Sequence, residues 1–150
     1  MLNESPIEIP WGIFYVQWSK RGLTSLRFPS RQRPTRRGMQ RSSRLVKLLV
    51  NYINGNKIKI DIPLDLTEGT VFQRRVWKQI CAIPYGKTRS YKWLANMLGC
   101  PSAVRAVANA CGANKIPIIV PCHRVIASDG SIGGYSPGVR WKKRLLRLEK

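Results

Sequence analysis

One segment, residues 116–126, constrains this chain more than any other. It is an apolar run, interrupted by two prolines, that leads directly into Cys122 and His123. His123 is the only histidine of the sequence. Adjacent side chains diverge in a strand or a helix, so we expect residues 121–123 to form a turn in which Cys122 and His123 communicate, directly or through water.

The Cys-His pair indicates a positioned nucleophile. A thiol attacks as the thiolate, and its ordinary pKa of about 8.5 leaves little thiolate near neutrality, so a base is required. His123, with an ordinary pKa of about 6.5, is the natural base. Taken alone, these two residues are equally compatible with a buried, inert cysteine at the end of a core strand.

The charge balance points to a polyanionic partner. Lys and Arg number 27 against 7 Asp and Glu, for a formal net charge of +20 over 150 residues. Nucleic acid is the leading interpretation, a basic membrane-surface protein is a second, and solvation alone is a third. The sequence has neither a signal-peptide pattern nor a long apolar stretch, so we expect a cytoplasmic protein with no membrane partner.

The cysteine pattern argues against a metal site. The four cysteines include no Cys-x-x-Cys pair, and residues 1–80 contain neither Cys nor His. Tetrahedral zinc would have to recruit scattered cysteines, among them the presumed nucleophile. We therefore predict no metal and no cofactor.

Residues 1–66 are predicted to form a small α/β subdomain. Residues 11–18 and 23–28 are rich in β-formers and flank a turn at 19–22, which predicts a hairpin. A basic loop follows at 29–41, then a helix from Ser42 or Ser43 that stops at Gly55, and an alternating strand at 57–62. The apolar stripe of this helix is Leu45, Leu48, Leu49 and Tyr52.

Residues 67–150 are predicted to form a mainly helical domain, so that the whole chain is of the α/β (α+β) class. Thr70 caps a helix to about residue 82, and a last helix spans 141–148. Between them, helices at 90–98 and 102–111 are joined by 99–101, with Ser102 as the second cap, in a helix-turn-helix pattern. The side chains expected to be buried are Val71, Phe72, Val76, Trp77 and Ile80 on the first helix and Val104, Val107, Ala108 and Cys111 on the third.

The opposite face of the 102–111 helix is small and nearly uncharged, comprising Ser102, Arg105, Ala106 and Asn109. A helix that reads bases in the major groove needs several long polar side chains. Small residues instead permit the close approach that a minor groove requires, with Arg105 available to enter the base stack. A plain surface arginine is the alternative interpretation of Arg105.

Several runs in fixed order resemble the O6-alkylguanine-DNA alkyltransferase family. They are Ile-Pro-Tyr-Gly-Lys-Thr-Arg-Ser-Tyr at 83–91, Ala-Val-Arg-Ala-Val-Ala at 103–108, Asn114, Pro-Cys-His-Arg-Val-Ile at 121–126 and Gly-Gly-Tyr-Ser at 133–136. The resemblance covers about 70–150. It implies a DNA repair protein that moves an alkyl group from O6 of guanine irreversibly to its own Cys122, each molecule acting once. It also implies that the target base is flipped out by a helix-turn-helix in the minor groove.

The resemblance assigns roles to individual residues. Cys122 would be the nucleophile, His123 the base acting through water, Glu149 the group that orients His123, Asn114 a brace and Tyr91 the group acting on the base. The implied DNA contacts are Ser90, Tyr91, Lys92, Ser102, Ala103, Arg105, Ala106, Asn109, Gly112 and Ser128. The implied base pocket is Val125, Tyr135 and Ser136. A frayed terminal glutamate is the alternative interpretation of Glu149.

The implied partner is double-stranded DNA that contains O6-alkylguanine, bound by a monomer that associates with the nucleoid. Two further hypotheses remain: a non-enzymatic helix-turn-helix DNA binder, and a cysteine hydrolase using the Cys-His pair. The first needs no nucleophile, so Cys122 argues against it. The second predicts turnover without DNA.

Overall fold

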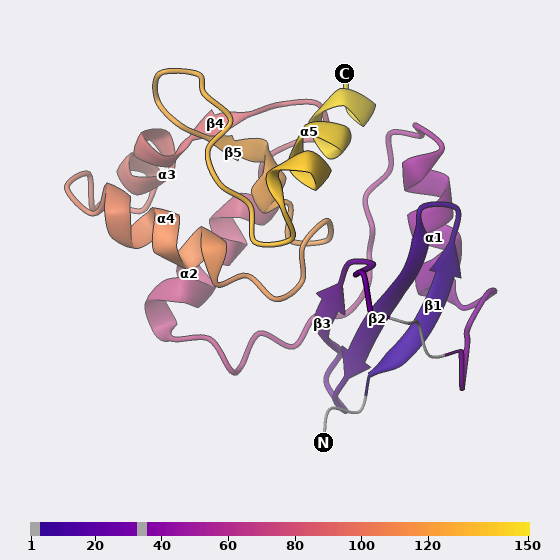
Figure 1. Cartoon of the computed structure of the whole chain (residues 1–150). Helices are drawn as coiled ribbons and strands as arrows, with labels where there is room; N and C mark the ends of the chain where they lie inside the picture. Colours follow the sequence, from indigo (N-terminus) through magenta and orange to yellow (C-terminus); the bar gives the residue numbers. More distant parts are fainter. Residues whose placement is uncertain (1–3, 33–35) are drawn as a thin grey trace. The chain divides into compact units, whose positions relative to one another are not determined.

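The computed structural model describes residues 4–32 and 36–150 and has a mixed α/β fold (Figure 1). The chain divides into two compact units, Met1–Asp65 and Leu66–Lys150; the predicted boundary lies one residue further on. In the described residues, every helix is too short or too polar to cross a membrane.

The first unit contains a three-stranded antiparallel sheet, in the order β1 (Ser5–Ile9), β2 (Gly12–Trp18) and β3 (Leu23–Arg27). The predicted hairpin is confirmed as β2 and β3. Strand β1 was not predicted; it pairs with β2 so that Ile7 lies opposite Phe14. Both of these side chains are fully buried, and the Phe14 ring lies 4.9 Å from that of Phe28 between centroids.

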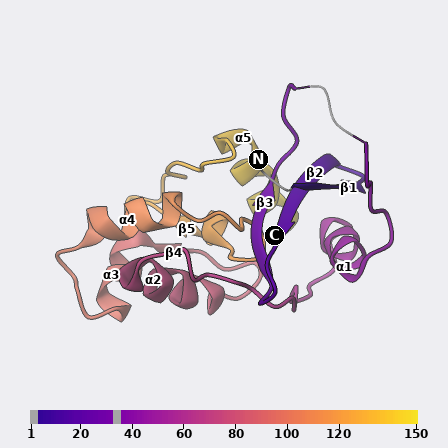
Figure 2. The same cartoon turned by 90° about the horizontal axis from the view of Figure 1, so that it is seen from below.

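Helix α1 (Arg44–Ile53) packs against this sheet (Figures 1 and 2). The predicted start is confirmed, since the Ser43 hydroxyl accepts a hydrogen bond from the Val46 amide at 3.3 Å. Leu45, Leu49 and Tyr52 are buried as predicted, whereas Leu48 is only half-buried.

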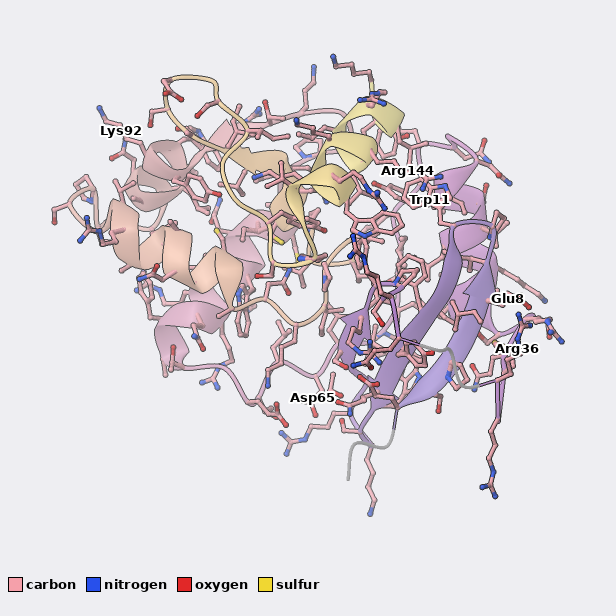
Figure 3. The ribbon with its side chains drawn as sticks, viewed as in Figure 1. Glu8, Trp11, Arg36, Asp65, Lys92 and Arg144 are labelled. Atoms are coloured by element: carbon pink, nitrogen blue, oxygen red, sulfur yellow. The ribbon has the colours of Figure 1, made fainter. Side chains whose placement is uncertain are left out.

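The basic loop predicted at 29–41 is tied to β1 where it is described; its residues 33–35 lie outside the described part. Gln40 exchanges backbone hydrogen bonds with Pro6 and Glu8. The Glu8 carboxylate is 2.6 Å from Arg41 and 3.7 Å from Arg36, and Figure 3 labels Glu8 and Arg36 side by side. These pairs are exposed, so each contributes little stability.

The prediction of a strand at 57–62 is wrong. These residues are irregular, and only Leu64, just beyond them, forms an isolated bridge to Leu23. Alternation of apolar and polar residues is therefore not sufficient for a β-strand, because the backbone must also form hydrogen bonds with a neighbouring strand.

The second unit begins with α2 (Val71–Cys81), which packs beside α3 (Tyr91–Met97) and α4 (Val104–Gly112) (Figures 1 and 2). Thr70 and Gln73 form a capping box, which confirms the predicted start of α2. Val76, Trp77 and Ile80 are buried as predicted. Val71, in contrast, is 67% exposed and Phe72 is only half-buried, so the prediction of their burial is wrong.

The predicted helix-turn-helix is confirmed as α3 and α4. Ser90 caps α3 by accepting from the Trp93 amide at 2.9 Å. The predicted cap of α4 is wrong, because Ala103 is the N-cap and no side chain bonds to this end. The inward face of α4 also differs: Val107 and Cys111 are buried as predicted, but Ala110 takes the place expected for Val104 and Ala108.

The remaining elements bring the Cys-His segment next to α3 and the last helix. A short 3-10 helix, η1 (Cys122–Arg124), confirms the predicted turn and leads into β5 (Val125–Ile126). Strand β5 pairs in parallel with β4 (Arg89–Ser90), which directly precedes α3. Helix α5 (Val139–Leu148) contacts η1.

Candidate active site

Cys122 is buried and held by Asn114. The Asn114 amide nitrogen donates to the Cys122 sulfur at 3.2 Å and to the Val120 carbonyl at 2.9 Å. Its oxygen accepts from the Ile116 amide at 2.9 Å. Asn114 follows the end of α4, so one side chain fixes the thiol relative to the helix-turn-helix.

His123 forms a buried hydrogen bond with Glu149, with 2.6 Å between Nε2 and Oε2. A carboxylate can only accept, so Nε2 carries the hydrogen and Nδ1 keeps the lone pair that can take a proton. Burial lowers the pKa of His123, although the bond to Glu149 opposes this shift. The imidazole is therefore neutral near pH 7.

Glu149 is the centre of a buried polar network, and the interpretation of a frayed terminal residue is wrong. It is 4% exposed and forms the C-cap of α5. Besides His123, it accepts from Arg124 at 2.8 and 3.0 Å and from the Gly86 amide at 3.2 Å. The Arg124 guanidinium balances the carboxylate charge and also donates to the Ile83 carbonyl at 2.8 Å.

Gly86 is required by this network. Its φ of +78° lies in the left-handed region, and a Cβ there would come within 2.9 Å of the Glu149 carbonyl oxygen. Any other residue would push the end of α5 away from the 86–88 loop. The Pro-Tyr-Gly sequence at 84–86 thus ends α2 and at the same time admits Glu149.

Cys122 lines a pocket of about 330 Å3. The pocket lies between the start of α3, the second half of α4 and the 133–138 loop. Its lining residues are Tyr91, Ala108, Asn109, Cys111, Gly112, Cys122, Gly134, Tyr135 and Ser136. The volume falls within the range of small-molecule sites and suits a purine base with a small substituent.

The pocket keeps the thiol protonated at rest. Burial raises the pKa of Cys122, and the Asn114 hydrogen bond and the Lys142 charge offset this only in part. Cys111 lines the same pocket, and burial, together with the neighbouring Cys122, raises its pKa to about 12. Neither thiol therefore attacks without a base, and Cys122 is the one adjacent to His123.

Lys142 is a site residue that sequence reasoning missed. It lies on α5 with no exposed surface, and its ammonium donates to the Val125 carbonyl at 2.7 Å and to the Gly134 carbonyl at 3.1 Å. Burial lowers its pKa, which the nearby Cys122 and Cys111 oppose. The amphipathic pattern of α5 gave no signal for it, since four other Lys and Arg residues occupy the same helix.

Tyr91 lines the pocket at the first position of α3. Burial, with smaller contributions from Cys111 and Cys122, raises its pKa to about 12, so the phenol keeps its proton. Gly133 packs against it: a Cβ at that position, where φ is +72°, would lie 3.1 Å from the phenol oxygen. The 133–138 loop is thus closely packed at Tyr91.

The predicted base-pocket residues divide into two groups. Tyr135 and Ser136 line the pocket, and the Ser136 hydroxyl donates to the Gly112 carbonyl at 2.6 Å, which joins the loop to the end of α4. Val125 is buried outside the lining, and its carbonyl accepts from Lys142. Its amide donates to the Cys122 carbonyl. The carbonyls of Cys122 and Val125 thus each hold one hydrogen bond and retain a second lone pair.

The predicted DNA contacts are mostly exposed, and three of them, Tyr91, Asn109 and Gly112, line the pocket. Asn109 and Gly112 lie at its edge on α4, and Lys92 points away from the unit at α3 (Figure 3). The exposed members are Lys92, Ser102, Arg105, Ala106, Asn109, Gly112 and Ser128, while Ser90, Tyr91 and Ala103 are half-buried.

The approach to Cys122 contains one strained residue. Ile118 has a φ of +75°, which is unfavourable for a β-branched side chain, and it is buried. Such a conformation costs about 1–3 kcal/mol and persists where the surroundings impose it. Here the flanking Pro117, the fixed Asn114 and the buried Val120 hold the segment that delivers the thiol.

A buried thiol with a neutral base, facing a pocket beside a helix-turn-helix, defines a class of proteins that couple a reactive cysteine to a motif typical of DNA binding. Residues 71–150 match the family described as 6-O-methylguanine DNA methyltransferase, DNA binding domain. The chain belongs to this family, which confirms the resemblance seen in the sequence.

Individual relatives agree with this assignment. The chain is 41% identical to the methylated-DNA–protein-cysteine methyltransferase of Mycolicibacterium paratuberculosis, with 100% of this chain and 93% of that protein aligned. It is 51% identical over 104 residues to the regulatory protein Ada of Salmonella typhimurium; this covers 69% of the chain but only 29% of that longer protein. The crystal structure of Mycobacterium tuberculosis OGT in complex with DNA superimposes with a TM-score of 0.83 at 42% identity, covering 97% of this chain and 92% of that chain.

Proposed function

We propose that the protein repairs DNA by transferring an alkyl group from O6 of guanine to the sulfur of Cys122, once per molecule. The observation that carries the proposal is the buried Cys122 sulfur, braced by Asn114 at 3.2 Å and facing a base-sized pocket, with the His123–Glu149 pair next to it. A relative that aligns with the whole chain, from Mycolicibacterium paratuberculosis, is named methylated-DNA–protein-cysteine methyltransferase.

The transfer is a displacement at the alkyl carbon. His123 takes the thiol proton at Nδ1, through water, and the resulting sulfur lone pair forms the S–C bond. The C–O6 bond breaks, and its electron pair stays on guanine. The Tyr91 phenol, which retains its proton at neutral pH, donates a hydrogen bond toward N3 of the leaving base. The guanine anion takes up one proton and His123 releases the one that it took from Cys122, so the net reaction moves one proton from the thiol to guanine.

Glu149 and Arg124 support the proton transfer from Cys122 to His123, and at rest their two charges neutralise each other. Glu149 stabilises the imidazolium that forms when Cys122 loses its proton, and Arg124 neutralises Glu149 beforehand. Lys142 adds a positive charge close to the developing thiolate. This arrangement stabilises charge only as it appears, which is the general basis of electrostatic catalysis.

The base must leave the helix to reach the sulfur. A stacked guanine cannot present its O6 substituent to a buried thiol, and extruding a base costs a few kcal/mol, less for a damaged base. The small outer face of α4 suits close contact with the minor groove, and Arg105 is exposed on this face to fill the vacated stack. DNA as the partner agrees with the net charge of +20 and with the DNA complex of the Mycobacterium tuberculosis relative.

Incubation with duplex DNA containing O6-methylguanine tests the proposal. We expect the DNA to regain guanine while the intact protein gains the mass of one methyl group and then stops reacting. Continuous turnover with release of the alkyl group into solvent would instead indicate the cysteine hydrolase. An unchanged protein and unchanged DNA would indicate a DNA binder without chemistry.

A further inference from the structure

The same unit contains a second pocket, of about 470 Å3. Gly86 and Glu149 in its lining belong to the buried network at His123, and its other lining residues have no role in the proposed reaction. Three segments line it: the loop at 86–88, the segment from Ile126, the last residue of β5, to Ile132, and the C-terminal part of α5 with the two residues after it. It is separate from the pocket of Cys122, with which it shares no lining residue.

Four exposed cations surround this second pocket: Lys87, Lys143, Arg147 and Lys150. None of their side chains forms a hydrogen bond or ion pair with the described residues. Glu149 is the only acidic side chain among the described lining residues, and its oxygens already accept from Gly86, His123 and Arg124. The second pocket is therefore a concave site with a positive charge that the protein does not neutralise.

The interior of the second pocket is apolar. Ile126, Ile132 and Leu146 contribute half-buried side chains to its lining. A surface that serves only solubility has no need of a cavity with an apolar lining behind its charges. A cationic rim over an apolar lining matches a nucleotide unit, whose phosphate meets the cations while its sugar covers the apolar side chains.

The position of the second pocket selects DNA as the source of that nucleotide. The 86–88 loop continues into Ser90 and Tyr91, and the segment from Ile126 to Ile132 contains Ser128, all of them proposed DNA contacts. Strands β4 and β5 pair between these two segments, which fixes them to each other. A strand of DNA that follows the proposed contacts therefore passes close to the rim.

We infer that the second pocket binds a backbone phosphate and its sugar from the DNA strand that flanks the lesion, with Lys87, Lys143 and Arg147 contacting the phosphate. This inference rests on the proposed function for the identity of the ligand. It adds to the footprint of the protein a contact that carries no sequence information but anchors the strand beside the flipped base.

The first test compares two doubly substituted variants that lose the same charge. One is Lys143→Gln with Arg147→Gln, at the second pocket; the control is Lys47→Gln with Lys57→Gln, at exposed positions of the first unit. Affinity for a long duplex is measured against salt concentration. Each lost phosphate contact lowers the slope of log affinity against log salt by about 1, so we expect a decrease of up to about 2 for the pocket variant and none for the control.

The second test locates the phosphate. Single phosphates of the duplex are replaced in turn by neutral methylphosphonates, and each duplex is bound to the wild type and to the pocket variant. At one or two flanking positions, the replacement should weaken binding of the wild type but not weaken the variant further. Additive losses at every position, equal slopes for the two variants, or binding of a second separate duplex at the pocket would each overturn the inference.

Alkyl transfer from free O6-benzylguanine, measured in parallel, separates this inference from the proposed function. The substituted residues, Lys143 and Arg147 at the second pocket and Lys47 and Lys57 in the control, have no role in that reaction, so both variants should react as fast as the wild type. A wild type that fails to react would refute the proposed function, while the two binding tests would still decide whether the second pocket holds a DNA phosphate.

Discussion

Around Cys122, the polar side chains are buried and hydrogen-bonded, whereas the outer face of α4 is small, exposed and almost without polar contacts. Glu149 alone accepts from three residues, while Arg105 forms no side-chain hydrogen bond or ion pair with any described residue. Under the proposed function, the first region serves a reaction that needs fixed geometry. The second then accommodates DNA, which supplies its polar contacts only when bound.

Substitution of Glu149 should have the largest effect, since it would disrupt the buried network. Glu149→Ala leaves Arg124 as a buried charge without its partner, and breaking such a pair costs about 3–5 kcal/mol. We expect a strongly lowered melting temperature together with the loss of alkyl transfer. Glu149→Gln, which keeps the shape of the side chain, serves as the control. A melting temperature of Glu149→Ala equal to that of the wild type would show that the network does not stabilise the fold.

His123→Asn should slow transfer by roughly 10²–10⁴-fold, the usual contribution of a positioned base. The pKa of Cys122 is raised, so without His123 the thiolate fraction, and with it the rate, should increase as the pH rises above neutral. The pKa of His123 is lowered, so the wild-type rate should stay flat near neutrality and decrease only in acid. Single-turnover rates across pH check both profiles, and a variant insensitive to pH would contradict the role of His123.

Arg105→Ala should have a smaller effect than His123→Asn, and it should affect only the reaction with duplex DNA. Only a duplex has to be opened, at a cost of a few kcal/mol, so repair of duplex DNA should slow by about 10–100-fold while reaction with free O6-benzylguanine is unchanged. Ala106→Ser, on the same exposed face of α4, is a control that retains Arg105. Equal losses on the two substrates would show that Arg105 does not act in base flipping.

Alkylation of Cys122 should destabilise the protein by the smallest amount. The sulfur is packed against Asn114 in a buried site, and added carbon in such a site costs about 1–3 kcal/mol. We expect the melting temperature to decrease by several degrees, more for a benzyl than for a methyl group, with greater protease sensitivity near residues 100–115. An unchanged or raised midpoint would show that the site accommodates its product.

The sequence predicts the features that depend on local patterns and misses those that depend on contacts between distant residues. The hairpin, α1, α2 and the helix-turn-helix follow from local periodicity and caps such as Ser43 and Thr70, and the Cys122–His123 turn follows from the chemistry of adjacent residues. Strand β1 was missed because Pro6 and a short apolar pattern conceal an edge strand. Local patterns also could not distinguish the buried Lys142 from the exposed cations beside it, since its burial depends on carbonyls at Val125 and Gly134.

The most direct test asks which of the two thiols in the pocket receives the alkyl group. Wild type, Cys111→Ser and Cys122→Ser are each incubated with excess O6-benzylguanine, weighed intact and then mapped by peptide mass. We expect one benzyl group on Cys122 in the wild type and in Cys111→Ser, and none in Cys122→Ser. A benzyl group on Cys111, or continued alkylation of Cys122→Ser, would contradict the claim that Cys122 is the acceptor.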